Sequence, residues 1–216
     1  RDVTDPPRWA ASPVGVRAGI DADAHVAESR VGPVSVAVVF VSRRTALHDD
    51  EYEAMARRME EHGVRWLEEP VRPMDDYDGL RFVREHSNIP IAAGENEYTH
   101  FGFKSLLEKD AVDMLQPDVI KAGGLLCCRK ILGMAEAWNT PLITHSFYYG
   151  PGVAATAHFV MANPLSDEME INTAPLEQDF IHPSFRPVGG KIELSDRPGL
   201  GIEVDDDVVA HHRIDR

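Results

Sequence analysis

Short apolar runs alternate with amphipathic stretches along most of the chain. The runs predict strands at residues 14–20, 34–41, 64–67, 89–93, 112–115, 142–144 and 169–172. The stretches between them repeat apolar positions at helical spacing and predict helices at residues 21–30, 49–62, 76–85, 102–109, 123–138 and 153–161. Strands that alternate with helices of this length indicate a parallel sheet with right-handed crossovers, so we expect an α/β fold.

The pattern divides the chain into three parts. Residues 1–13 contain three prolines and no periodicity, which predicts a loop leader. Residues 14–172 carry the repeated strand–helix unit and form the expected domain. Residues 173–216 are rich in proline and glycine and read as a tail segment with one hairpin near residues 191–194.

Four consecutive strand runs are followed by an ionisable side chain, namely Glu68, Glu95, Asp118 and His145. Functional residues at the carboxyl ends of many strands favour a (β/α) TIM-type barrel, whereas an open sheet places its site at one switch point. A complete barrel typically takes ~250 residues. The predicted strands are too few for that, so we expect a partial barrel.

The composition of the chain limits the kinds of partner it can bind and indicates the cellular compartment in which we expect it. The formal net charge of −14 over 216 residues argues against binding to nucleic acid or an anionic membrane. Two cysteines occur side by side, as Cys127 and Cys128, and adjacent residues are poor disulfide partners. We therefore expect a reduced, cytoplasmic protein, with no signal peptide at its start and no apolar run of ~20 residues that could cross a membrane.

The four ionisable side chains suggest a metal site beside an acid–base pair. Neighbouring strands lie roughly 4.8 Å apart, so Glu68 and Glu95 can share one hard cation such as Mg²⁺. A carboxylate such as Asp118 can fix the tautomer of an imidazole such as His145 and raise its basicity. Each feature alone is more often structural, because Glu-Glu-Pro commonly makes a surface turn and a loop histidine is usually incidental. The joint arrangement favours function.

Four motifs in this order resemble the mandelate racemase/muconate lactonizing enzyme branch of the enolase superfamily. They are WLEEP at 66–70, AAGEN at 92–96, QPDVIKAGG at 116–124 and THSFYYGPG at 144–152. The resemblance covers roughly residues 14–172, and RPGLGI at 197–202 is also similar to the family's closing segment. It implies a modified (β/α)7β barrel whose members abstract the proton α to a carboxylate and hold the enediolate on Mg²⁺.

The resemblance also implies roles for individual residues. Glu68 and Glu95 would be metal ligands, and strand alternation allows only one of Glu68 and Glu69 to point inward. His145 would be the base or acid and Asp118 its partner. Lys121 would support that region, and Glu170 falls where the family places an acid that hydrogen-bonds the substrate carboxylate.

The N-terminal part departs from the family pattern. The family's first metal ligand, an aspartate, falls on Ser42, and serine is a poor Mg²⁺ ligand. The family's Lys-x-Lys or Lys-x-Arg pair falls on Gly15 and Arg17, so only the second position is basic. The first unit of the barrel looks too short, and the family's N-terminal capping domain has no counterpart in this sequence.

Three interpretations remain open. The first is a Mg²⁺-dependent dehydratase for an acid sugar or hydroxy acid, with Ser146, Tyr148 and Tyr149 lining the pocket; racemisation or epimerisation needs a second base where Gly15 stands. The second is an impaired or truncated remnant without turnover. The third, an unrelated barrel enzyme, leaves the motif order unexplained. We expect a small-molecule carboxylate as substrate and a homo-oligomer, because an incomplete barrel leaves sheet edges to cover.

Overall fold

The computed structural model describes residues 18–20, 39–41, 54, 56, 57, 59, 60, 64–165, 168–172, 174–188 and 190–214. Near the N-terminus, β1 (Ala18–Ile20) and β2 (Val39–Val41) pair in parallel, with Ala18 opposite Val39. The predicted strands at 14–20 and 34–41 are confirmed where they are described. Gly15, Arg17, Ser42, the leader at 1–13 and the predicted helix at 21–30 lie outside the described residues.

The central sheet contains β3 (Leu67–Glu68), β4 (Ile91–Ala93) and β5 (Met114–Leu115), all parallel. Single parallel bridges extend it, because Leu115 pairs with Leu142 and Thr144 pairs with Met169. The predicted strands at 142–144 and 169–172 are therefore present as bridges rather than as full strands. Each strand of this sheet pairs with the next one along the sequence.

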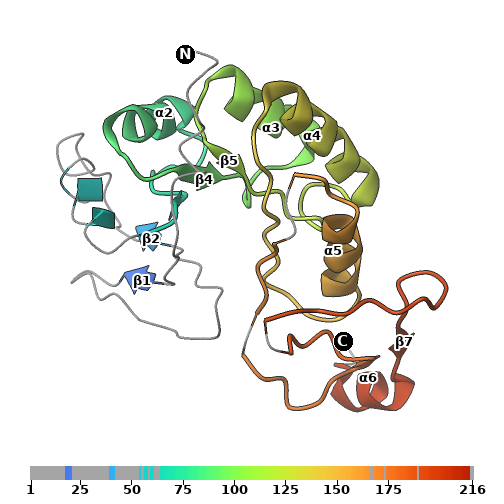
Figure 1. The fold of residues 1–216 in the computed structure, drawn as a ribbon. Helices are drawn as coiled ribbons and strands as arrows, with labels where there is room; N and C mark the ends of the chain where they lie inside the picture. The colour runs from blue at the N-terminus through green and yellow to red at the C-terminus, as the bar shows by residue number, and fades with distance from the viewer. Residues whose placement is uncertain are drawn as a thin grey trace.

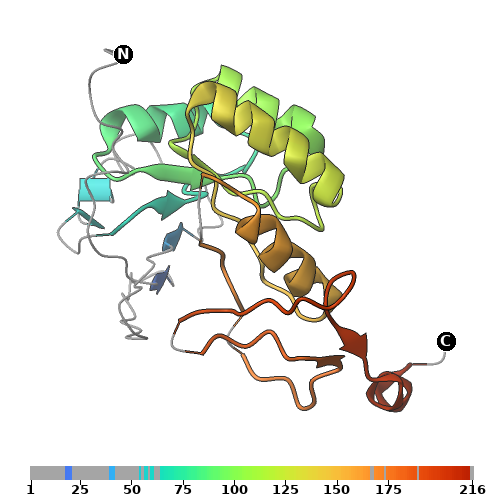
Figure 2. The same ribbon diagram turned by 45° about the vertical axis from the view of Figure 1, so that its right-hand side comes forward.

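Three helices pack on one side of this sheet (Figures 1 and 2). They are α2 (Tyr77–His86), α3 (Thr99–Glu108) and α4 (Leu125–Trp138). The Asp76 carboxylate accepts a hydrogen bond from the Gly79 amide at the start of α2, and Asn139 ends α4 with a left-handed backbone at φ 52°. The helices bury apolar side chains against the strands, such as Leu80, Phe103 and Ile131. These three predicted helices are confirmed with ends shifted by up to three residues, and the described residues 54, 56, 57, 59 and 60 of the predicted helix at 49–62 are also helical.

A buried ion pair joins α2 to the start of β5. The Arg84 guanidinium, 3% exposed, donates from Nε to Asp113 Oδ1 at 2.9 Å. Asp113 also accepts the Ile91 amide at 3.0 Å. The pair lies at the amino ends of the strands. It therefore stabilises the end of the sheet opposite to the carboxylates described below.

The C-terminal part is more structured than the tail we predicted. Helix α5 (Pro151–Met161) is followed by the antiparallel pair β6 (Ile181–His182) and β7 (Glu203–Val204), and by α6 (Asp206–His212), drawn in red in Figure 1. The hairpin is found slightly earlier than expected, with Val188 bridged to Lys191. Helix α6 escaped prediction because it buries no residue and so has no apolar stripe.

In the part of the chain that the structure describes, no helix is long and apolar enough to span a membrane.

Candidate functional site

The strand ends β3, β4 and β5 and the loop at 144–146 bring the predicted ionisable residues together. Glu68 closes β3 and is 2% exposed. Its Oε2 accepts hydrogen bonds from Gln116 Nε2 at 2.6 Å and from Trp66 Nε1 at 3.3 Å. Its Oε1 is buried and has no hydrogen-bond partner among the described residues. Burial raises the pKa of Glu68 to about 7, against the two donors, and the charges of Glu170 and Glu95 add to the rise.

Glu95 follows β4 and reaches the same region. Its Oε1 accepts a hydrogen bond from Asn96 Nδ2 at 3.0 Å. Its Oε2 lies 3.1 Å from His145 Nε2, an ion-pair distance without hydrogen-bond geometry, so this buried oxygen also lacks a donor among the described residues. Burial raises the pKa of Glu95, partly offset by the charges of His145 and Lys121. Glu68 and Glu95 therefore each present one unsatisfied carboxylate oxygen.

Asp118 and His145 form a buried pair on neighbouring strand ends, which are joined by a parallel bridge. His145 Nδ1 lies 2.7 Å from Asp118 Oδ2, and Asp118 Oδ1 accepts the Ile120 and Lys121 amides at 2.8 Å each. Burial alone would raise the pKa of Asp118, but the hydrogen bonds from His145 and the Lys121 amide outweigh burial and lower it. The ionised Asp118 holds a proton on His145 Nδ1 and leaves Nε2 to face the centre.

Two carboxylates face His145 Nε2. Glu95 Oε2 lies at 3.1 Å and Glu170 Oε2 at 3.4 Å, and Glu170 also accepts the Ser146 amide at 3.2 Å. Burial tends to lower the pKa of His145, but the hydrogen bond to Asp118 and the charges of Glu95 and Glu170 raise it overall. Lys121 Nζ approaches Glu95 Oε1 only to 4.0 Å. The imidazole can therefore take up and hold a proton at Nε2.

The donor set suits a hard divalent cation in part. Two buried carboxylates with raised pKa values and unsatisfied oxygens are the ligands that Mg²⁺ prefers. Among the described residues, however, no three histidine, cysteine, aspartate or glutamate side chains are arranged to hold one metal ion. Glu68 and Glu95 thus fit as two ligands, and the predicted position of the third, Ser42, lies outside the described residues.

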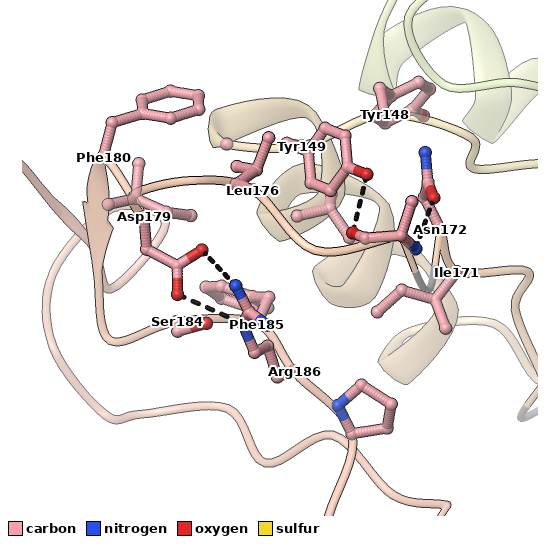
Figure 3. A pocket seen from close by; sticks show the side chains of 15 residues that line it. Tyr148, Tyr149, Ile171, Asn172, Leu176, Asp179, Phe180, Ser184, Phe185 and Arg186 are labelled. Carbon is pink, nitrogen blue, oxygen red and sulfur yellow. Dashed lines mark hydrogen bonds and ion pairs between the residues drawn. The ribbon is translucent and has the colours of Figure 1, made fainter. Parts of the chain in front are cut away.

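Two of the three predicted substrate-binding residues, Tyr148 and Tyr149, lie around a different cavity (Figure 3), whereas the amide of Ser146 donates to Glu170 in the site described above. Tyr148 and Tyr149 line a pocket of about 200 Å³ together with residues of the C-terminal part. The Tyr149 hydroxyl donates to the Ala174 carbonyl at 2.8 Å, and the Tyr148 hydroxyl lies 2.8 Å from Thr156 Oγ1. Neither Glu68 nor His145 lines this pocket. The roles of Ser146, Tyr148 and Tyr149 in substrate binding stay predictions.

Sequence reasoning placed the ionisable residues but missed the side-chain N–H donors that hold them. Gln116 and Trp66 both donate to Glu68, and Asn96 donates to Glu95. A usable signal was present, because Gln116 stands at the end of β5 next to the strand that carries Glu95, and Asn96 follows Glu95 directly. Glu68 is buried and Glu69 is half-buried, in agreement with the expectation that one residue of the pair points inward.

Characterised relatives are enzymes that act on sugar acids and lactones. The chain is 34% identical over 163 residues to D-xylonate dehydratase of Haloferax volcanii, covering 74% of this chain and 39% of the relative. It is 32% identical over 162 residues to D-galactarolactone cycloisomerase of Agrobacterium fabrum, covering 70% of this chain and 43% of the relative. The chain thus spans less than half the length of these relatives.

Solved structures give the same family. A mandelate racemase/muconate lactonizing enzyme-like protein from Rubrobacter xylanophilus superimposes with a TM-score of 0.76 at 34% identity, over 86% of this chain and 47% of that one. An enolase from Bradyrhizobium complexed with magnesium and mandelic acid gives 0.71 at 27% identity, over 86% and 48%. The sequence model described as Enolase C-terminal domain-like matches residues 19–208. The chain therefore belongs to this family, within the mandelate racemase/muconate lactonizing enzyme branch of the enolase superfamily.

Proposed function

We propose that this protein takes part in removing the proton α to the carboxylate of an acid sugar or hydroxy acid, followed by loss of the β-hydroxyl as water. The observation that carries the proposal is the His145 imidazole, held at Nδ1 by Asp118 at 2.7 Å while its Nε2 faces two carboxylates. An imidazole fixed in one tautomer beside acidic groups is suited to general acid–base catalysis. The family of the chain and its dehydratase relative support the same reaction class.

His145 performs both proton steps in this proposal. Its Nε2 takes the α-proton, and the ionised Asp118 stabilises the imidazolium that results. The imidazolium then gives the proton to the departing β-hydroxyl, the C–O bond breaks, and a carbon–carbon double bond forms. The raised pKa of His145 favours the first step, and its causes are the hydrogen bond to Asp118 first and then the charges of Glu95 and Glu170.

Glu68 and Glu95 would hold Mg²⁺ through the oxygens that lack a donor in the described part of the chain. When bound, Mg²⁺ would stabilise the negative charge that develops on the substrate carboxylate as the α-proton leaves. Glu170, which accepts the Ser146 amide, would in its acid form donate a hydrogen bond to the substrate carboxylate. Lys121, whose side chain is about one third exposed, would contribute positive charge near Glu95.

Isomerisation is the second candidate, and the cycloisomerase relative favours it. Returning a proton to the opposite face of the substrate needs a second base, which the resemblance places at Gly15. Dehydration needs only one imidazole, so the described site favours it. Arg17 and Ser42 would complete the site from the N-terminal strands.

The strand order supports a further structural proposal. Each strand of the central sheet pairs with its successor in sequence, as in a (β/α) barrel, so we infer an incomplete (β/α)7β barrel. The open edges of such a sheet would be covered in a homo-oligomer.

The experiment is exchange of the α-proton in D₂O, followed by NMR over a panel of acid sugars with Mg²⁺. We expect exchange with at least one acid, its loss in His145→Asn, and its retention in His86→Asn, an exposed control whose ring Nδ1 lies 2.8 Å from the Phe82 carbonyl of its own helix. Exchange that survives in His145→Asn would refute the role of His145. The absence of exchange with every acid would refute the enzyme and favour a remnant without turnover.

A further inference from the structure

Glu69, the second glutamate of the Glu-Glu pair, holds an unusual backbone conformation close to the site. Its φ is 40°, in the left-handed region that residues with a side chain seldom adopt. Its amide still donates to the Ala92 carbonyl at 2.9 Å, so the residue remains tied to β4. The positive φ lets Glu68 enter the buried centre while the Glu69 carboxylate turns to the loop that follows β4.

That carboxylate is bound closely by the loop. Glu69 Oε2 accepts a hydrogen bond from Asn96 Nδ2 at 2.6 Å. Glu69 Oε1 accepts the amides of Gly94 and Asn96 at 3.4 Å each. The residues on both sides of Glu95, Gly94 and Asn96, are therefore anchored to Glu69, the residue that follows Glu68.

Asn96 uses its amide group for two carboxylates at once. The same Nδ2 that binds Glu69 donates to Glu95 Oε1 at 3.0 Å, so both amide hydrogens are engaged. With Oε1 held in this way, Glu95 turns Oε2 toward His145, and Oε2 is the oxygen that lacks a donor in the described part of the chain. Asn96 thus determines which oxygen of Glu95 faces the centre.

We propose that Glu69 and Asn96 are positioning residues that set the affinity of the site for a divalent cation. Neither touches the cation; Asn96 orients the Glu95 carboxylate, and Glu69 orients Asn96. This proposal rests on the proposed function, because it takes Glu68 and Glu95 as the metal ligands. It explains why a third carboxylate lies beside them, since a neutral amide stands between Glu69 and Glu95.

The test is a double-mutant cycle on the metal affinity of the full chain, without substrate. Binding of Mn²⁺ is measured by electron paramagnetic resonance and binding of Mg²⁺ by calorimetry, for wild type, Asn96→Ala, Glu69→Gln and the double variant. We expect Asn96→Ala to weaken binding by about 10–100-fold, as for other residues that orient a metal ligand. Glu69→Gln should weaken metal binding by about tenfold, because the NH₂ group of the new glutamine would face N–H groups that now donate to the Glu69 carboxylate.

Coupling distinguishes positioning from general loop stability. If Glu69 acts through Asn96, the double variant binds Mn²⁺ as Asn96→Ala does, within about twofold. If the loss of affinity in the double variant equals the product of the losses in the two single variants, Glu69 and Asn96 act independently and the proposal is overturned. Glu97→Gln is the matched control, because it makes the same substitution next to Asn96 in the loop after β4, and Glu97 accepts its hydrogen bond from the Tyr77 hydroxyl. The metal affinity of Glu97→Gln should equal that of wild type.

Two further results would also overturn the proposal. One is unchanged affinity in a folded Asn96→Ala or Glu69→Gln protein, with folding verified by circular dichroism. The other is tighter binding by Asn96→Asp, which would make residue 96 itself a ligand. A wild-type chain that binds neither ion refutes the metal site on which the proposed function depends, whereas wild-type binding with unaffected variants refutes only the Glu69–Asn96 proposal.

Discussion

Replacing Glu68 by glutamine should stabilise the metal-free protein at alkaline pH. The substitution keeps the shape of the side chain, and its carbonyl oxygen can still accept from Gln116 and Trp66. The new NH₂ group takes the place of Oε1, which has no donor among the described residues, so no donor pair is forced together. What disappears is a buried negative charge.

The size of the effect follows from the pKa of Glu68, which burial raises from 4.5 to about 7. Between these values the folded chain keeps a proton that the unfolded chain has released, so the free energy of unfolding falls as the pH rises through this window. The full loss above pH 7 is about 3 kcal/mol, at 1.36 kcal/mol per pKa unit. Glu68→Gln removes this loss, which corresponds to an increase in Tm of about 6–12 °C.

The assay is urea unfolding at pH 5 and pH 8 with EDTA, for wild type, Glu68→Gln and Glu177→Gln. The exposed Glu177 controls for removing one negative charge. We expect Glu68→Gln to exceed wild type at pH 8 and to match it more closely at pH 5. A variant no more stable than wild type at pH 8, or a difference equal at both pH values, would refute the reasoning. Adding Mg²⁺ should reverse the order, because only wild type retains both proposed ligands.

Three other substitutions or measurements examine separate features. In Asp118→Asn, the new NH₂ group donates to His145 Nδ1, so the ring proton moves to Nε2 and Nε2 can no longer accept the α-proton. The rate of α-proton exchange should therefore fall by about 10⁴-fold with little change in Tm. A loss of rate below tenfold would contradict the pairing of Asp118 with His145. Arg84→Met breaks a buried ion pair and should lower the free energy of unfolding by about 3–5 kcal/mol. Arg81→Met removes an exposed pair and should lower it far less, so similar urea midpoints for the two variants would contradict the distinction. Burial raises the pKa of Cys128 to about 12, so iodoacetamide at pH 8 should leave this thiol unmodified in the native protein by mass spectrometry, and rapid alkylation would show that the thiol is accessible.

The sequence predicted the central part of the fold because two signals agreed there. Between residues 64 and 161, apolar runs of strand length alternate with stripes at helical spacing, and the sheet, α2, α3 and α4 follow that alternation. In the C-terminal part the prediction found the hairpin but missed β6, β7 and α6. Helix α6 lies on the surface, so its signals were the Asp205 cap on the Val208 amide, aspartates in the first turn and histidines in the last. Strands β6 and β7 have two residues each, which is too short for a visible alternation.

The candidate site was predictable in its charges but not in its orientation. The carboxyl ends of the parallel strands meet at one edge of the sheet, and this edge carries Glu68, Glu95, Asp118 and His145. Which oxygen each carboxylate presents depends on the donors around it, and one of these contacts, from Gln116 to Glu68, joins residues 48 positions apart in sequence. Periodicity carries no information about such contacts, so the hydrogen bonds could not be derived from it.

The strand order has a consequence for how the chain is made. Because each strand of the central sheet pairs with the one synthesised just before it, the sheet can grow in the direction of translation, with no strand waiting for a distant partner. The proposed metal ligands Glu68 and Glu95 emerge from the ribosome before His145. A nascent chain would therefore be able to bind a cation before it could transfer a proton, and a bound cation would stabilise the half-built sheet while the remaining strands are added.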